Sequence, residues 1–188
     1  MKTIRETAGD GYPLPVSTGG ELRLRLLGEA DEIPFRAAHR AMLDEGFEFG
    51  WGLREELEWS AYLRLLADQR DERGRKEGTV PATLLVAEVG GRIVGRTSVR
   101  HTLDDALLRV GGHIGYAVLP PYRRRGYATE ILRQSVIVAR SLGVDRILVT
   151  CDEDNAASAT VIEANGGRWE NTLPAGPGRP GKRRYWIG

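Results

Sequence analysis

The chain contains 188 residues, of which 41% are hydrophobic and 28% charged, a composition typical of one globular domain that buries its own core. The formal net charge of +1 argues against partners held by bulk charge, such as nucleic acid or an anionic membrane, and no apolar run is long enough to span a membrane. The single cysteine, Cys151, excludes an intramolecular disulfide and a cysteine-based zinc cluster, and the polar residues 1–10 do not resemble a signal peptide, so we predict no metal and a cytoplasmic location.

Hydrophobic patterning divides the chain into a turn-rich lead-in over residues 1–20 and one domain over residues 21–188. Polar and apolar residues that alternate predict strands, and apolar residues three and four positions apart predict helices. In chain order we expect a strand over 21–27, helices over 29–43 and 54–67, strands over 83–89, 92–99 and 112–119, a helix over 126–142, a strand over 146–151, a helix over 155–164, and two closing strands, the last over 183–187.

The order of these elements predicts an α/β fold in which a mixed, mostly antiparallel sheet carries helices on both faces. Gly90 and Gly91 form a hairpin turn between two of the strands. Charged residues predict a solvated loop over 68–79, and a polar connection is expected over 102–109. The Gly-x-Gly-x-x-Gly fingerprint of a dinucleotide-binding fold is absent. The helix over 126–142 is expected to bury one stripe made of Ala128, Ile131, Leu132, Ser135, Ala139 and Leu142.

The most informative segment runs over residues 116–130, where an apolar strand ends at two prolines, three arginines and a glycine form a turn, and a helix begins. Backbone N–H groups at a helix N-terminus have no partner within the helix and attract anions. Gly126 carries no Cβ, so the backbone there can approach a ligand closely. The pattern predicts a cradle for a phosphate or pyrophosphate. A nucleic-acid patch at the three arginines would need more basic residues and exposed aromatic residues nearby.

Two motifs within this order of elements resemble the GCN5-related N-acetyltransferase superfamily. The sequence RRRGYA over residues 123–128 is similar to the family signature Arg/Gln-x-x-Gly-x-Gly/Ala, and GYAVLP over 115–120 is similar to its fourth strand. The sequence NAAS over 155–158, followed by Gly166 and Gly167, resembles its second motif. The resemblance covers the chain from about residue 21 to 187 and implies a single domain whose fourth and fifth strands splay apart.

Acetyl-CoA is the co-substrate that this resemblance implies, with no metal. Its pyrophosphate is expected on the backbone amides of the signature loop, and its pantetheine chain is expected to pair with the fourth strand as an added strand. Arg123 occupies the Arg/Gln position of the signature. The residues implied in cofactor binding are Tyr116, Ala117, Val118, Arg123, Arg124, Arg125, Gly126, Tyr127, Ala128, Asn155 and Ser158.

Asn155 and Ser158 each have two interpretations that the sequence leaves open. Asn155 is placed to cap the helix over 155–164, which is the common use of asparagine at a helix start, and the resemblance also gives it a contact with pantetheine. Ser158 lies in the first turn, where its hydroxyl often bonds back to the backbone.

The catalytic groups are less clearly marked. Many members of the family carry a tyrosine seven residues after the asparagine, but here that position is Ile162, which leaves Tyr127 and Tyr185 as alternative proton donors. His113 titrates in the range that suits a general base, although side chains alternate along a strand and a buried structural role is the competing interpretation. Cys151 suggests either an acyl-enzyme nucleophile or a small buried residue.

The acceptor site is expected over residues 44–51, between the first two helices. Glu45, Glu48 and Trp51 belong to a run in which carboxylates and aromatic residues alternate, and this pattern suits a cationic amine. The alternative is that Phe47, Phe49 and Trp51 only pack the helix pair.

We therefore expect a cytoplasmic acetyl-CoA-dependent N-acetyltransferase that acetylates a primary amine by direct attack in a ternary complex. The acceptor is a small-molecule amine or an amine of a protein or peptide, with no nucleic-acid or membrane partner, and the resemblance allows a homodimer. The alternatives are a non-catalytic acyl-CoA-binding module or sensor, and a transferase that uses another acyl donor.

Overall fold

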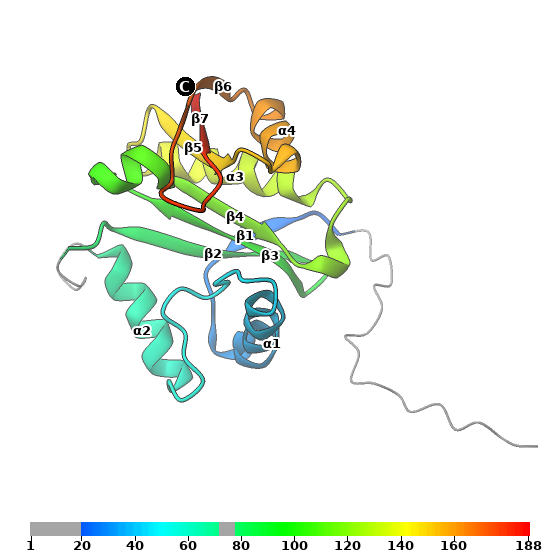
Figure 1. Ribbon diagram of the computed structural model, residues 1–188. Coiled ribbons are helices and arrows are strands. Elements are labelled where there is room, and N and C mark those ends of the chain that lie inside the picture. The colour runs from blue at the N-terminus through cyan, green and yellow to red at the C-terminus, as the bar shows by residue number, and fades with distance from the viewer. Residues whose placement is uncertain (1–19, 72–77) are drawn as a thin grey trace, which may run out of the picture.

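The computed structural model describes residues 20–71 and 78–188, which form one mixed sheet with helices on both faces (Figure 1). The lead-in predicted over residues 1–20 lies, apart from Gly20, outside the described residues, as does much of the charged loop predicted over 68–79. The strands are β1 (Arg23–Arg25), β2 (Ala82–Val89), β3 (Arg92–Arg100), β4 (Ile114–Val118), β5 (Ile147–Asp152), β6 (Arg168–Leu173) and β7 (Lys182–Ile187), and the helices are α1 (Glu32–Leu43), α2 (Trp59–Arg70), α3 (Tyr127–Ser141) and α4 (Ala156–Ala164).

The sheet has the strand order β1-β2-β3-β4-β5-β7-β6. Neighbouring strands are antiparallel except β4 and β5, which run parallel and share a single register pair, Ile114 with Val149. Beyond this pair the two strands diverge. The predicted α/β fold, the mostly antiparallel sheet and the splayed fourth and fifth strands are therefore confirmed.

Helices α1 and α2 cover one face of the sheet, and α3 and α4 lie on the other (Figure 1). Phe35 of α1 and Tyr62 of α2 are fully buried, with ring centroids 6.0 Å apart. Phe49, from the connection between these helices, lies 5.3 Å from the Phe35 ring and is also fully buried. The expectation that this aromatic segment packs the helix pair therefore holds for Phe49, whereas Trp51 is 42% exposed.

The second core lies between the sheet and the pair α3 and α4. It is built from Leu132 and Ala139 of α3, which are fully buried, together with apolar residues of β5 and β7. Leu142, predicted to lie on the same stripe, is 40% exposed because α3 ends at Ser141 and leaves it at the C-cap. Val136 is buried on the stripe instead.

Two other boundaries differ from the sequence prediction. Helix α2 begins at Trp59 and not near residue 54, since a loop with turns occupies residues 53–58. The polar connection predicted over 102–109 ends in a short π-helical turn over Leu107–Gly111. Within residues 20–71 and 78–188 we find no helix with the length and apolar character to cross a membrane.

Candidate functional site

One edge of β4 has no neighbouring strand beyond Ile114. The backbone bonds β4 to β3 at His113 and at Leu119. In the alternating pattern of an antiparallel pair, the backbone groups of Tyr116 and Val118 therefore point to the opposite edge. Strand β5 reaches this edge only at Ile114. The divergence leaves an open strand edge of the kind that can pair with an extended ligand.

His113 lies where β4 and β5 separate. Its backbone N–H donates to the carbonyl of Leu148 at 2.7 Å, and its Nδ1 accepts from the Leu148 N–H at 2.9 Å. The side chain is 8% exposed, and burial, followed by the charge of Arg100, lowers the pKa of the imidazole. The ring is therefore neutral near pH 7, with its proton on Nε2. Because Nδ1 is engaged, His113 has no free lone pair with which to accept a proton.

The signature loop joins the end of β4 to α3. Arg124 has a φ of 63° and Gly126 a φ of 79°, both left-handed, and Gly126 occupies the N-cap position of α3 without a side-chain cap. No described group accepts a hydrogen bond from the backbone N–H of any residue in the range 124–128. A Cβ placed on Gly126 would meet nothing within 4 Å, so the loop is open on that side. Five successive free donors at a helix N-terminus are the geometry that an anion cradle requires.

Arg123 differs from its two arginine neighbours because its side chain is held by the protein. Its guanidinium forms a 2.5 Å ion pair with Glu45, just after the end of α1, and its Nε donates to the Val118 carbonyl at 3.1 Å. Nη2 also lies 3.8 Å from the sulfur of Met42. The side chains of Arg124 and Arg125 are exposed. Arg123 therefore fixes the loop between β4 and α1, and its two neighbours remain available to a ligand.

Helix α4 closes the other side of the gap. Asn155 caps it by accepting from the Ser158 N–H at 2.9 Å, so its structural interpretation holds. The Ser158 hydroxyl lies 2.8 Å from the hydroxyl of Tyr116, which crosses from β4. Burial raises the pKa of Tyr116 to about 12, so this hydroxyl stays protonated near neutral pH. The Tyr116–Ser158 contact links β4 to α4 across the gap between β4 and β5.

Most of the other groups that the sequence offered for chemistry are buried. Ile162 is fully buried, and Tyr185 is 1% exposed in the same core. Cys151 is 6% exposed, and burial raises the pKa of its thiol, which opposes the thiolate form that a nucleophile needs. Tyr127 is half-buried in the first turn of α3. Tyr116, expected to bind the cofactor, is thus also the tyrosine whose hydroxyl reaches the gap.

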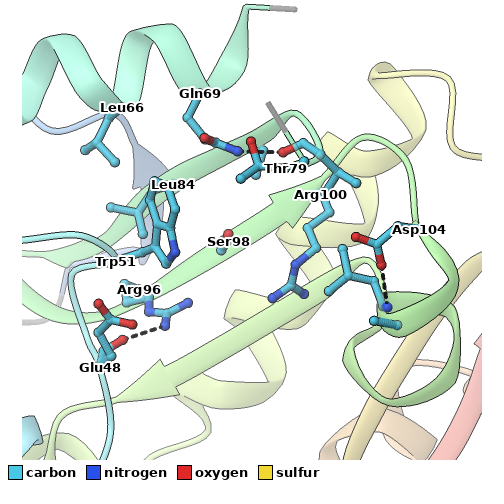
Figure 2. A pocket seen from close by; sticks show the side chains of 15 residues that line it. Glu48, Trp51, Leu66, Gln69, Thr79, Leu84, Arg96, Ser98, Arg100 and Asp104 are labelled. Atoms are coloured by element: carbon cyan, nitrogen blue, oxygen red, sulfur yellow. Dashed lines mark hydrogen bonds between the residues drawn. The ribbon is translucent and has the colours of Figure 1, made fainter. Parts of the chain in front are cut away.

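A cavity of about 450 Å³ lies on the side of β3 that faces α1 and α2 (Figure 2). Glu48 and Trp51, two of the three predicted acceptor residues, line it, and Glu48 also accepts from the Gly52 N–H at 3.0 Å. Glu45, the third, pairs with Arg123 and is not among its lining residues. The structure therefore brings Glu48 and Trp51 together and separates Glu45 from them.

Sequence reasoning missed Arg96 and Arg100, which leave β3 into this cavity (Figure 2). The signal was present, because Arg96, Ser98 and Arg100 stand at alternate positions of a strand and therefore share a face. Arginines on a face that also packs helices are unusual, but the pattern alone did not show that a cavity opens there.

A comparison with known protein families identifies the family of this chain. Residues 21–168 match the model of the acetyltransferase (GNAT) domain. The chain belongs to this family. The resemblance seen in the two sequence motifs is thereby confirmed, and the family supports an N-acetyltransferase. A comparison with curated protein sequences found no match.

Solved structures share the fold of this GNAT domain. A putative acetyltransferase from Salmonella typhimurium, determined with acetyl-CoA, is 17% identical with a TM-score of 0.59, covering 88% of this chain and 92% of its own. Spermidine N-acetyltransferase from Vibrio cholerae, in complex with CoA and spermine, is 16% identical with a TM-score of 0.61, covering 88% and 94%. RimJ from Mycobacterium smegmatis, in complex with CoA-disulfide, is 22% identical with a TM-score of 0.63, covering 89% and 82%.

Proposed function

We propose that this GNAT domain binds acetyl-CoA and transfers the acetyl group to a primary amine. One observation carries the proposal: the five free N–H groups of the loop over 124–128 continue directly into the open edge of β4. An anion cradle joined to a free strand edge suits a ligand that has a pyrophosphate at one end and an extended amide chain at the other. Coenzyme A has this form.

The residues present fit this ligand. The pyrophosphate would lie on the loop amides, with the exposed Arg124 and Arg125 nearby. The pantetheine amides would pair with Tyr116 and with the N–H of Val118, since the Val118 carbonyl already accepts from Arg123. The acyl end would then lie toward Ile114, where β4 and β5 meet.

When bound, acetyl-CoA supplies an activated acetyl group, and the protein has to bring a neutral amine to it. The cavity that holds Glu48 and Trp51 opens beside β4, since Arg96 in its wall donates to the Gly115 carbonyl at 3.2 Å. An acceptor in this cavity would therefore approach β4 from the side of α1 and α2. Attack within a ternary complex requires no nucleophile from the protein, which suits the buried Cys151.

The same geometry offers candidates for proton transfer. Tyr116 is our candidate for protonating the departing thiolate, because its hydroxyl lies at the gap and remains protonated. His113 holds β4 to β5 through Nδ1, so a base role for it requires that bond to break. A carboxylate such as Glu48, acting through water, is the alternative route for the amine proton.

Two measurements test the proposal. Titration calorimetry with acetyl-CoA and with CoA should give one saturable site, and the absence of binding at high micromolar ligand would refute the cofactor assignment. Release of free thiol across a panel of amines should then show turnover. Cofactor binding without turnover of any amine would favour an acyl-CoA-binding module, an alternative that the loss of the family tyrosine at Ile162 keeps open. A longer acyl-CoA that reacts faster than acetyl-CoA would identify a different donor.

A further inference from the structure

The floor of the cavity beside β3 carries two guanidinium groups. Figure 2 shows Arg96 and Arg100 leaving the same strand, with Ser98 between them. Arg96 is only 9% exposed, and its Nε has no hydrogen-bond partner in the described part of the chain. The Ser98 hydroxyl is also without a partner there. Both donors are therefore unpaired and belong to residues that line the cavity.

No described carboxylate pairs directly with the guanidinium groups on this floor, although the Phe47 ring lies 4.9 Å from that of Arg96 and the charges of Glu48 and Asp104 act on them from further away. Arg96 donates to the carbonyls of Gly115 and Glu48, at 3.2 and 3.1 Å, and Arg100 donates to the Gly112 carbonyl at 2.8 Å. Carbonyl oxygens satisfy hydrogen bonds but carry no net charge. Neither arginine forms an ion pair with a residue in the ranges 20–71 and 78–188. A cation held away from water without a directly paired counter-charge is costly, and an anionic ligand would reduce that cost.

The rest of the cavity has a different character. Leu66 and Leu84 form an apolar wall, and Trp51 lies at its side (Figure 2). The two carboxylates among the lining residues, Glu48 and Asp104, are exposed. Negative charge therefore lies at the rim and positive charge on the floor. This arrangement is complementary to a small molecule that has an ammonium group, an apolar part and an anionic group.

The arginines also place the cavity next to the edge that would hold the cofactor. The guanidinium of Arg96 reaches the carbonyl of Gly115, one residue before Tyr116, and that of Arg100 reaches Gly112, just before β4. A small ligand anchored on this floor therefore lies next to β4. We propose that the acceptor is a small amine that carries a carboxylate, as an amino acid does, and that Arg96, Ser98 and Arg100 bind this carboxylate. The inference rests on the proposed acetyltransferase function.

The test compares amino acids with acceptors that lack the carboxylate or replace it. Thiol release from acetyl-CoA is measured with each of the twenty common amino acids and with the carboxamide of each. An aminoalkylphosphonate and spermine serve as further acceptors. At least one amino acid should react with a kcat/KM about 100-fold above that of its carboxamide, because the amide leaves the arginines unpaired. The same amino acid should raise the melting temperature of the protein without acetyl-CoA, and its carboxamide should not.

Variants then locate the effect. Arg100→Gln should reduce the ratio between amino acid and carboxamide by about tenfold or more, and Arg100→Lys should restore part of it. Arg109→Gln, an exposed arginine that is not among the lining residues, removes the same charge and should leave the ratio unchanged. Arg100 is preferred to the more deeply buried Arg96 because its replacement leaves less of the core disturbed.

The outcomes separate the two proposals. If acetyl-CoA binds normally but amino acids and their carboxamides react equally well, the carboxylate site is wrong and the transferase function stands. The same holds if the protein prefers spermine or an amidated peptide. A preference for the aminoalkylphosphonate would overturn the carboxylate assignment. Failure of calorimetry to detect acetyl-CoA would refute the proposed function itself.

Discussion

The Nδ1 atom of His113 accepts a 2.9 Å hydrogen bond from the backbone N–H of Leu148, and this contact ties β4 to β5 at the point where the strands part. Only one register pair, Ile114 with Val149, links the two strands as neighbours. The hydrogen bond therefore stabilises the start of the gap in which we place the cofactor.

Replacing His113 separates this structural role from that of a general base. The Oδ1 atom of asparagine can take the place of the imidazole Nδ1, so His113→Asn should keep the bond and lose little activity or stability. His113→Ala leaves a buried N–H unpaired and should lower the free energy of unfolding by about 1–3 kcal/mol. Chemical denaturation and thiol release measure the two effects. If the folded His113→Asn protein binds acetyl-CoA but turns over about 100-fold more slowly, His113 is the base.

The two buried histidines should make stability depend on pH. His39 resembles His113, since its Nδ1 accepts from the Gly50 N–H at 2.9 Å and burial lowers its pKa. The unfolded chain, with histidine pKa values near 6.5, then binds more protons than the folded protein as the pH falls. The free energy of unfolding should be greatest above about pH 6.5 and decrease between pH 6.5 and 5.5. Urea titrations of the wild-type and His113→Asn proteins should show a shallower decrease in the variant, and equal slopes would contradict this account.

Gly126 is expected to matter for ligand binding more than for folding. Its φ of 79° costs a residue with a Cβ about 1 kcal/mol, and a displaced loop would misdirect the amides over 124–128. Gly143, at the other end of α3, has a φ of 83° and the same open surroundings, which makes Gly143→Ala the matched control. Both variants should lose similar stability, but only Gly126→Ala should weaken CoA binding in calorimetry. Equal CoA affinities in the two variants would place the pyrophosphate elsewhere.

The ion pair between Arg123 and Glu45 should position the loop without adding much stability. Its side chains are 43% and 41% exposed, and exposed pairs contribute about 0–1 kcal/mol. Arg123→Gln and Glu45→Gln should each weaken acetyl-CoA binding modestly. The double variant should bind acetyl-CoA no more weakly than Arg123→Gln alone, because both substitutions remove the same ion pair. Additive losses in calorimetry would mean that Arg123 contacts the cofactor directly.

The hydroxyl of Tyr116 can be tested against its partner. Tyr116→Phe removes both the bond to Ser158 and the proposed proton donor, whereas Ser158→Ala removes the bond alone. Each variant should lose about 1 kcal/mol of stability. Only Tyr116→Phe should also lower kcat, by about 10–100-fold, if the hydroxyl protonates the thiolate. Similar kcat values for the two variants would show that the contact is only structural.

The sequence predicted the fold and the cradle because both depend on local pattern. Strand alternation, the Gly90–Gly91 turn and the run over 123–128 each determine the backbone near them. The acceptor side depends on which segments meet, which no local pattern reveals. Glu45 and Glu48 stand three residues apart, yet one pairs with Arg123 and the other lines the cavity with Arg96. The charge of that cavity comes from β3, about fifty residues further along the chain.

The central claim is that the open edge of β4 holds the extended chain of acetyl-CoA. Amide hydrogen exchange of the protein with and without CoA measures this directly, because the backbone N–H groups of Tyr116 and Val118 face that edge and have no strand partner. The account predicts that saturating CoA slows exchange at these two amides and across the loop over 124–128, and leaves the outer strand β6 unchanged. Binding of CoA without slower exchange at Tyr116 and Val118 would contradict it.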